Sequence, residues 1–150
     1  MQRYLLDTNI LLLFLRQDTI WSDFQLRFDL NKSSNFISVV SLGELRALVL
    51  RNQWGERRMK ELETIETHFV VVDINIKSII NCYGEIDAFS QGKLRDKPLK
   101  GSSRSMGKND LWTASTASIL RLTLLTTDLD FNHLNNIFLD LKTIDLSTLR

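Results

Sequence analysis

The sequence predicts an α/β protein, a three-layer sandwich in which a central parallel sheet of about five strands lies between two layers of helices. Short β-rich runs alternate with helical patterns along the chain. A helical pattern separates each strand from the next, which is the crossover that a parallel connection requires. With 150 residues, 43% of them apolar, residues 1–150 are long enough for one domain with a hydrophobic core and too short for two ordinary ones.

The elements follow from the period of the apolar residues and from the turn-forming residues between the runs. We expect strands at residues 2–7, 35–40, 69–73, 122–127 and 138–144. We expect helices at residues 9–16, 20–31, 41–54, 55–67, 75–91, 108–121 and 128–135.

Two of these helices carry apolar residues on more than one side. On the helix at 20–31, one stripe is formed by Ile20, Trp21, Phe24 and Phe28, whereas Leu26 and Leu30 lie on the opposite side. The helix at 41–54 has a similar second apolar side, formed by Ala47, Leu50 and Trp54. Because a helix that is apolar on both sides is buried on both sides, this pattern favours a partner such as a second copy of the chain.

One irregular stretch, residues 92–107, is longer than ordinary structureless connections, so we expect it to be either disordered or functional. Residues 93–108 carry six basic side chains against one acid, although the formal net charge of the chain is only +1. The basic residues are Lys93, Arg95, Lys97, Lys100, Arg104 and Lys108. A basic stretch on an acidic body points to nucleic-acid contact, while the commoner explanation is a solvated loop.

Several classes of protein are disfavoured by composition. No apolar run approaches the roughly 18 residues of a membrane span, so we expect no membrane association. The apolar run at 10–15 follows Asp7, which a signal-peptide core tolerates poorly. A single cysteine, Cys82, excludes an internal disulfide and a thiolate metal cage, and fits a reducing cytoplasm.

Four acids are candidates for a common site, although each also has a structural explanation. Asp7 can end a strand and cap the following helix, and Glu44 stands three residues after Ser41, which is the spacing of a capping box. Asp110 and Asp128 fall at the starts of predicted helices, where the free amides and the helix dipole favour a carboxylate.

Capping does not explain why these acids share a location. In a parallel sheet the carboxyl ends of strands and the starts of the following helices lie along one edge, where such folds bind ligands. Asp7, Glu44 and Asp128 belong to that edge directly, whereas Asp110 reaches it only if the preceding loop crosses the top of the sheet.

Four ionised carboxylates about 5 Å apart would repel one another by roughly 3 kcal/mol per pair at an effective dielectric near 20. Over all pairs this exceeds the ~5 to 15 kcal/mol net stability of a typical domain. The cluster must therefore bind a cation or take up protons. Carboxylate oxygens select hard divalent metals, Mg²⁺ or Mn²⁺.

Four segments carry a resemblance to a known family. They are YLLDTN (4–9), SLGEL (41–45), KNDLWTA (108–114) and TTDLDF (126–131). In this order they resemble the four motifs of PIN-domain ribonucleases, and most closely those of the VapC toxins of bacterial toxin–antitoxin pairs. The resemblance extends from residue 4 to about residue 144. The extended basic loop before Asn109 departs from the family pattern and leaves substrate preference open.

The resemblance implies a PIN-like fold and a Mg²⁺-dependent endoribonuclease acting on single-stranded RNA, with Mn²⁺ as a possible substitute. It assigns catalysis and metal binding to Asp7, Glu44, Asp110 and Asp128, with Asp130 as a further ligand for metal or water. It places Thr8, Asn9, Asn109 and Thr127 beside the metal as hydrogen-bonding groups. We expect Lys97, Lys100, Arg104 and Lys108 to contact RNA. The implied partners are RNA, a homodimer mate and a small antitoxin protein.

Other residues are expected to be structural. We assign Cys82 to the core, His68 and His133 to ordinary structural roles, and Trp112 to core packing rather than base stacking.

Three alternatives remain open. A haloacid-dehalogenase-like phosphotransferase needs a second Asp two residues after the first, where this chain has Asn9. A receiver-like domain could use Asp73 but lacks the adjacent acidic pair after the first strand. A catalytically silent RNA-binding or scaffolding domain of the same fold would have no use for the repulsion among the four acids.

Overall fold

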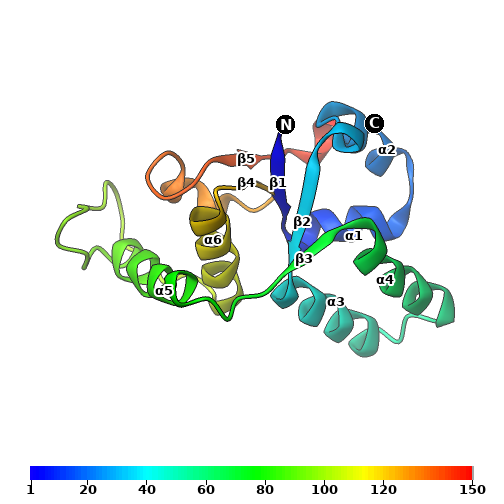
Figure 1. Cartoon of the computed structure of the whole chain (residues 1–150), viewed down its shortest axis with the longest axis horizontal. Helices are drawn as coiled ribbons and strands as arrows, with labels where there is room; N and C mark the ends of the chain where they lie inside the picture. Colours follow the sequence, from blue (N-terminus) through cyan, green and yellow to red (C-terminus); the bar gives the residue numbers. More distant parts are fainter. Residues whose placement is uncertain (150) are drawn as a thin grey trace.

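The computed structural model describes residues 1–149, which form a parallel sheet of five strands with helices on both faces, as the sequence predicts (Figure 1). The strand order is β3-β2-β1-β4-β5, and every neighbouring pair is parallel. The strands are β1 (Arg3–Leu6), β2 (Ser34–Ser38), β3 (Val70–Val72), β4 (Thr123–Thr126) and β5 (Leu141–Thr143). All five lie within or next to the predicted runs.

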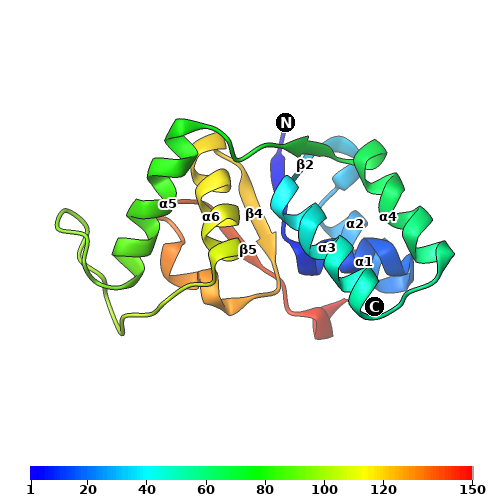
Figure 2. The ribbon, with the colours of Figure 1, turned by 90° about the horizontal axis from the view of Figure 1, so that it is seen from below.

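The helices form two layers. They are α1 (Thr8–Arg16), α2 (Thr19–Arg27), α3 (Val39–Arg51), α4 (Glu56–His68), α5 (Lys77–Ser90) and α6 (Lys108–Leu120), with short 3₁₀ segments η1 (Leu30–Lys32), η2 (Leu129–Leu134) and η3 (Leu146–Thr148). The helices α1 to α4 pack on one face of the sheet, and α5, α6 and η2 pack on the other (Figure 2). No helix within residues 1–149 combines the length and the apolar character needed to span a bilayer.

The pleat of the sheet divides the core in two. Along β1, Leu6 faces the core under α1 to α4, and Leu5 faces the core under α5 and α6. Along β4, Leu125 and Leu124 divide in the same way, because successive side chains of a strand point to opposite faces. All four leucines are fully buried. The central strands are therefore apolar on both sides, as expected for a covered parallel sheet.

The direction of the crossovers changes between β1 and β4. Chain connections from β1 to β2 and from β2 to β3 run over one face, whereas α5 and α6 carry the chain back to β4 over the other (Figures 1 and 2). Such a change leaves a crevice at the carboxyl ends of the two central strands, where open α/β sheets bind ligands. Asp7 and Asp128 follow these two strands.

Several predicted helix boundaries are wrong. The helix expected at 41–54 begins at Val39, because the Ser38 hydroxyl caps it by accepting a hydrogen bond from the Val40 amide at 3.1 Å. Glu44 therefore lies inside α3 and is not part of a capping box. The segment expected as a helix at 128–135 is the 3₁₀ segment η2, capped by the Asp128 carboxylate.

The expectation that Leu30 lies on an outward helix face is also wrong. The helix α2 ends at Arg27, and Asp29 adopts a left-handed conformation with φ 50° that turns the chain inward. Leu30 is consequently buried in the core, whereas Leu26 is 77% exposed. Trp54 lies beyond the end of α3 and packs against the core rather than outward.

The irregular stretch at residues 92–107, here called the basic loop, connects α5 to α6. It extends beyond α5, away from the sheet (Figures 1 and 2). Leu94 and Leu99 pack against the core under α5 and α6, and Met106 is buried there. The Lys97 ammonium lies 4.6 Å from the centroid of the Phe138 ring, a cation–π contact. The loop is thus held to the protein body by apolar and cation–π contacts, and the predicted alternative of disorder does not describe its structure.

Candidate active site

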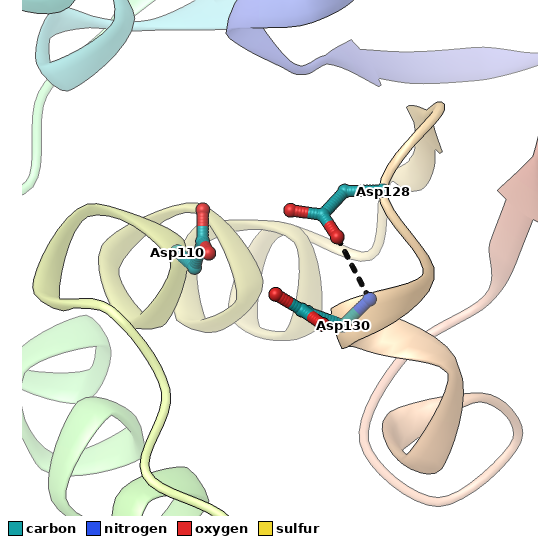
Figure 3. A group of neighbouring side chains, drawn as sticks. All are labelled: Asp110, Asp128 and Asp130. Atoms are coloured by element: carbon teal, nitrogen blue, oxygen red, sulfur yellow. Dashed lines mark hydrogen bonds between the residues drawn. The ribbon is translucent and has the colours of Figure 1, made fainter.

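Three carboxylates meet at the crevice beside β4. Asp110 lies in the first turn of α6, and Asp128 and Asp130 lie at the start of η2. One oxygen from each lies within 4.8 Å of the other two. Figure 3 shows the three side chains directed toward a common space. Asp110 reaches this edge because α6 leads into β4 and so begins at the carboxyl end of the sheet.

Asp7 is the most buried of the predicted acids, with 6% of its surface exposed. The Thr8 amide donates to Oδ1 at 2.8 Å, and the Thr126 hydroxyl donates to Oδ2 at 2.7 Å. Burial raises the pKa of Asp7, the two hydrogen bonds lower it, and the negative charges of Glu44 and Asp128 raise it further; the net direction is upward. Asp7 thus caps α1 and also belongs electrostatically to the acidic group.

Glu44 is linked to Asp7 through Thr8. The Thr8 hydroxyl donates to Glu44 Oε1 at 2.8 Å and lies 3.0 Å from the Ser41 hydroxyl. Glu44 is partly buried on the face of α3 that is turned toward α6. It lies outside the group of three carboxylates within 4.8 Å, but its charge acts on Asp110.

The electrostatic centre of the site is Asp110. Burial, together with the charges of Asp7, Asp128, Glu44 and Asp130 in decreasing order of effect, raises the pKa of its carboxyl to about 7. All five acids therefore share one electrostatic neighbourhood, as the sequence predicts for four of them and the family resemblance for the fifth. Without a cation the group lowers its repulsion by holding a proton on Asp110 near neutral pH.

Sequence reasoning missed Thr126, whose hydroxyl is the central hydrogen-bonding group of the site. This fully buried side chain donates to Asp7 and accepts from the Asp128 amide at 3.0 Å. The sequence favours Thr127 instead, but the amide of that residue makes a long hydrogen bond to Asn9 Oδ1, at 3.4 Å. Ser41, next to Thr8, was named only as a helix cap. A parallel register pairing Leu6 with Leu125 places Asp7 opposite Thr126, and this register is the signal that could have identified it.

The predicted RNA-contact residues do not all lie at the acids. Lys108 and Asn109 line a cleft of about 500 Å³ together with Glu44, Gly107 and Asp110. Arg104 is close enough to His133, three residues after Asp130, to contribute to lowering the pKa of that histidine, after the larger effect of burial. Lys97 and Lys100 are exposed residues of the basic loop, and the Lys97 ammonium lies over the Phe138 ring rather than at the acids.

Residues assigned to structural roles agree with the sequence analysis except for Trp112. Cys82 is buried in the core, and His133 bonds to the Ser90 hydroxyl at 2.7 Å while stacking on Phe89. Trp112 is only partly buried, because it projects from α6 toward α3 and borders a cleft rather than the core.

The donor set fits a hard divalent cation. All candidate ligand atoms are carboxylate oxygens, and three of them lie close enough to share one ion. The negative charges of the neighbouring acids raise the pKa of Asp110, after the larger effect of burial. Mg²⁺ binds through a few carboxylates and retains several waters, which matches a partly exposed site. Asp110, Asp128 and Asp130 are the residues that would hold it, with Asp7 adjoining.

Comparisons with known proteins agree on the fold. A family model described as PIN domain matches residues 4–137. The structure of VapBC2 from Rickettsia felis, bound to a DNA fragment from its promoter, has a chain with a TM-score of 0.76 and 23% identity, over 95% of this chain and 98% of that chain. VapBC-1 from nontypeable Haemophilus influenzae gives a TM-score of 0.67 and 21% identity, over 93% and 96% of the two chains. A chain from a toxin-antitoxin complex of Klebsiella pneumoniae gives a TM-score of 0.59 and 17% identity, over 89% of this chain and 92% of that chain. No curated protein matches the chain in sequence.

The raised pKa of Asp110 predicts an unusual pH dependence of stability. The unfolded carboxyl titrates near 3.8 and the folded one near 7, so the folded state binds more protons and the metal-free protein loses stability as pH rises between these values. After discounting for partial solvent access, we expect a loss of about 1–2 kcal/mol between pH 5 and pH 8, or about 3–6 °C in the melting temperature. Thermal unfolding in EDTA measures this difference.

The variant Asp110→Asn should remove most of that pH dependence, leaving a smaller part from Asp7. The matched control Asp140→Asn, at an exposed position outside the acidic group, should melt like the unmodified protein at both pH values. If the melting temperatures of Asp110→Asn and Asp140→Asn change equally with pH, Asp110 is not the titrating group.

Proposed function

Because this chain belongs to the PIN-domain family, we propose that it is a Mg²⁺-dependent endoribonuclease that hydrolyses phosphodiester bonds of single-stranded RNA. We further propose that it acts in the cytoplasm as the toxin of a toxin–antitoxin pair. Mn²⁺ should replace Mg²⁺, since both are hard cations with the same preference for oxygen ligands.

The observation that carries the proposal is the gathering of Asp110, Asp128 and Asp130 within 4.8 Å at the crevice between β1 and β4. Carboxylates that repel one another without a balancing positive charge lower the stability of the fold. At a ligand-binding edge of the sheet, such a group is explained by a role in binding a cation. The adjoining Asp7 and Glu44 extend the negative charge to five acids. A site of this charge binds the phosphodiester of RNA only with a cation present.

When bound, Mg²⁺ would supply a water of lowered pKa and neutralise negative charge on the scissile phosphate. The chain's own residues prepare the site for that chemistry. Thr126 and the Thr8 amide fix the orientation of the Asp7 carboxylate, and Asp128 is fixed by its bond from the Asp130 amide at 2.9 Å. Asp110, with a pKa near 7, releases its proton readily when a cation approaches. Lys108, at the start of α6, adds positive charge beside the site.

The partner proposal is supported by the complexes in which similar folds occur and by exposed apolar residues. The chain from Klebsiella pneumoniae was solved in a toxin-antitoxin complex. On this chain Leu26 of α2 and Leu50 of α3 are 77% and 65% exposed. Exposed leucines of this degree fit contact with another protein, either a small antitoxin or a second copy of the chain.

The nuclease proposal predicts that Asp7→Asn abolishes Mg²⁺-dependent cleavage while leaving the fold intact. The amide has the shape of the carboxylate: its oxygen can still accept from the Thr8 amide, and its nitrogen can donate to the Thr126 hydroxyl, which reverses that bond. The substitution removes a negative charge next to the metal. We expect a fall of at least about 100-fold in the rate of cleavage of a labelled transcript pool. The control Asp140→Asn should cleave at the unmodified rate.

Mapping the new RNA ends with and without Mg²⁺ tests the reaction itself. If the unmodified protein binds RNA but never cleaves it, the protein is the catalytically silent binding domain that the sequence analysis left open. Cleavage by Asp7→Asn at the unmodified rate would remove Asp7 from the active site.

The basic loop is proposed to follow the RNA backbone without reading bases. Replacing Lys97, Lys100 and Arg104 by Ser should weaken RNA binding and reduce the slope of log affinity against log salt by about 2, since each lost phosphate contact on a single strand removes about 0.7. Filter binding at several salt concentrations gives the slope. An equal number of Ser replacements at Arg57, Lys60 and Lys77, which are exposed elsewhere, is the control. An unchanged slope in the loop variant would make the loop a solvated linker.

The partner proposal predicts that the isolated protein associates through its exposed leucines. Leu26→Gln with Leu50→Gln should shift the protein to a monomer in light scattering without lowering its melting temperature, because neither side chain is in the core. Leu30 is unsuitable for this test because it is 4% exposed. A monodisperse monomer of the unmodified protein at high concentration would count against a homodimer, and the absence of a co-purifying small protein would count against an antitoxin.

A further inference from the structure

A cleft of about 510 Å³ opens between α3 and α6, next to the acidic site. One wall is the face of α3 that runs from Val40 to Arg51, and the other is formed by Asn109 and Trp112 of α6. Few side-chain atoms project into the cleft from the middle of the α3 wall, because the residues there are Gly43 and Ala47. A Cβ added at Gly43 would meet no heavy atom within 4 Å, so this part of the cleft is open space.

The cleft is continuous with the site. Glu44 and Asn109 border both this cleft and the smaller one that contains Asp110. A ligand in the cleft would therefore reach from the carboxylates at one end to the Arg51 guanidinium at the other. These two ends have opposite charge, and the middle is lined by aliphatic and aromatic groups.

Trp112 gives the cleft a rigid aromatic wall. Its ring packs against Tyr83 of α5, with ring centroids 4.4 Å apart and an interplanar angle of 45°. Tyr83 in turn packs against the core under α5 and α6. Trp112 is thus supported by Tyr83, and it remains partly exposed where it borders the cleft. A tryptophan held in this way can receive a flat partner without losing much conformational freedom.

We propose that this cleft is a nucleobase subsite, in which a base of the single-stranded RNA stacks on Trp112. The proposal rests on the proposed nuclease function and specifies how that site selects its substrate. Arg51 lies where it can contact a phosphate beyond the base, and the Asn109 amide can hydrogen-bond to the base edge. A base can enter the cleft only if it is unstacked, which accounts for a preference for single strands.

The chemistry of the cleft favours RNA over a peptide as its occupant. A nucleotide offers a flat base for Trp112 and phosphates on either side, one for the cation-bound acids and one for Arg51. A protein side chain occupying the same space is the competing outcome that the experiment distinguishes.

The test is a coupling measurement between Trp112 and individual bases. Binding of a single-stranded oligoribonucleotide is measured by fluorescence anisotropy in the non-cleaving Asp7→Asn background, with a series of oligonucleotides that lack one base at each position in turn. Trp112→Leu should weaken binding by about 5- to 150-fold, the range expected for loss of one stacked base. One abasic position should weaken binding to the parent protein similarly, but have little further effect in Trp112→Leu.

Further variants separate stacking from folding. Trp112→Phe keeps an aromatic face and should retain most of the affinity. Ala47→Leu places bulk in the cleft at an exposed helix position, and should weaken binding without lowering the melting temperature. Ile137→Ala is the control, because Ile137 is 46% exposed and does not border the cleft.

The outcomes separate this proposal from the nuclease proposal. Additive effects of Trp112→Leu and of every abasic position would overturn the subsite. So would an unchanged RNA affinity in Trp112→Leu combined with lost binding of a co-purified protein partner, which would assign the cleft to a protein side chain. If the unmodified protein fails to cleave RNA with Mg²⁺ but the coupling at one base is present, the nuclease proposal fails and the subsite stands.

Discussion

The parallel pairing of β1 with β4 is the constraint on which the rest of the site depends. Its register places Asp7 opposite Thr126 and allows the hydroxyl to bond to the carboxylate at 2.7 Å. The same pairing is the point where the crossovers change from one face of the sheet to the other, so α1 and α3 approach it from one side and α6 from the other. Acids that are far apart in the sequence are thereby collected at one crevice.

The stability of the fold and the chemistry of the site make opposite demands on these acids. Two of the carboxylates also serve the local structure, since Asp7 caps α1 and Asp128 caps η2. Asp110 has no such compensation among the described hydrogen bonds, and burial with four neighbouring charges raises its pKa to about 7. The apolar core, which covers both faces of the sheet, supplies the stability that the site gives up. A bound cation would reverse the loss, because it stabilises only the folded arrangement of the ligands.

The carboxylates and the cleft lie next to each other, and we assign the first to catalysis and the second to substrate positioning. The carboxylates come from strand ends and first helical turns, which are held by the sheet, whereas the cleft beside them is formed by the facing sides of α3 and α6. Small residues on α3 and the supported ring of Trp112 give that cleft its shape. Residues of the two functions are adjacent on the same helices, with Asp110 and Trp112 two positions apart on α6. Under the proposed function, a change in the cleft would alter which RNA binds without altering the groups that would hold the cation.

The sequence by itself determined the α/β class and the five strands, and it singled out Asp7, Glu44, Asp110 and Asp128 as candidates, because apolar periodicity and helix-start chemistry are local properties that a single chain displays. It also indicated that Asp7, Glu44 and Asp128 share one edge, since that follows from parallel topology alone. Only the tertiary structure decided that Thr126 rather than Thr127 bonds to Asp7, because strand register is fixed by packing between distant residues. The partial exposure of Trp112 and the burial of Leu30 were likewise undetermined, since a helical pattern shows which residues share a face but not what covers that face.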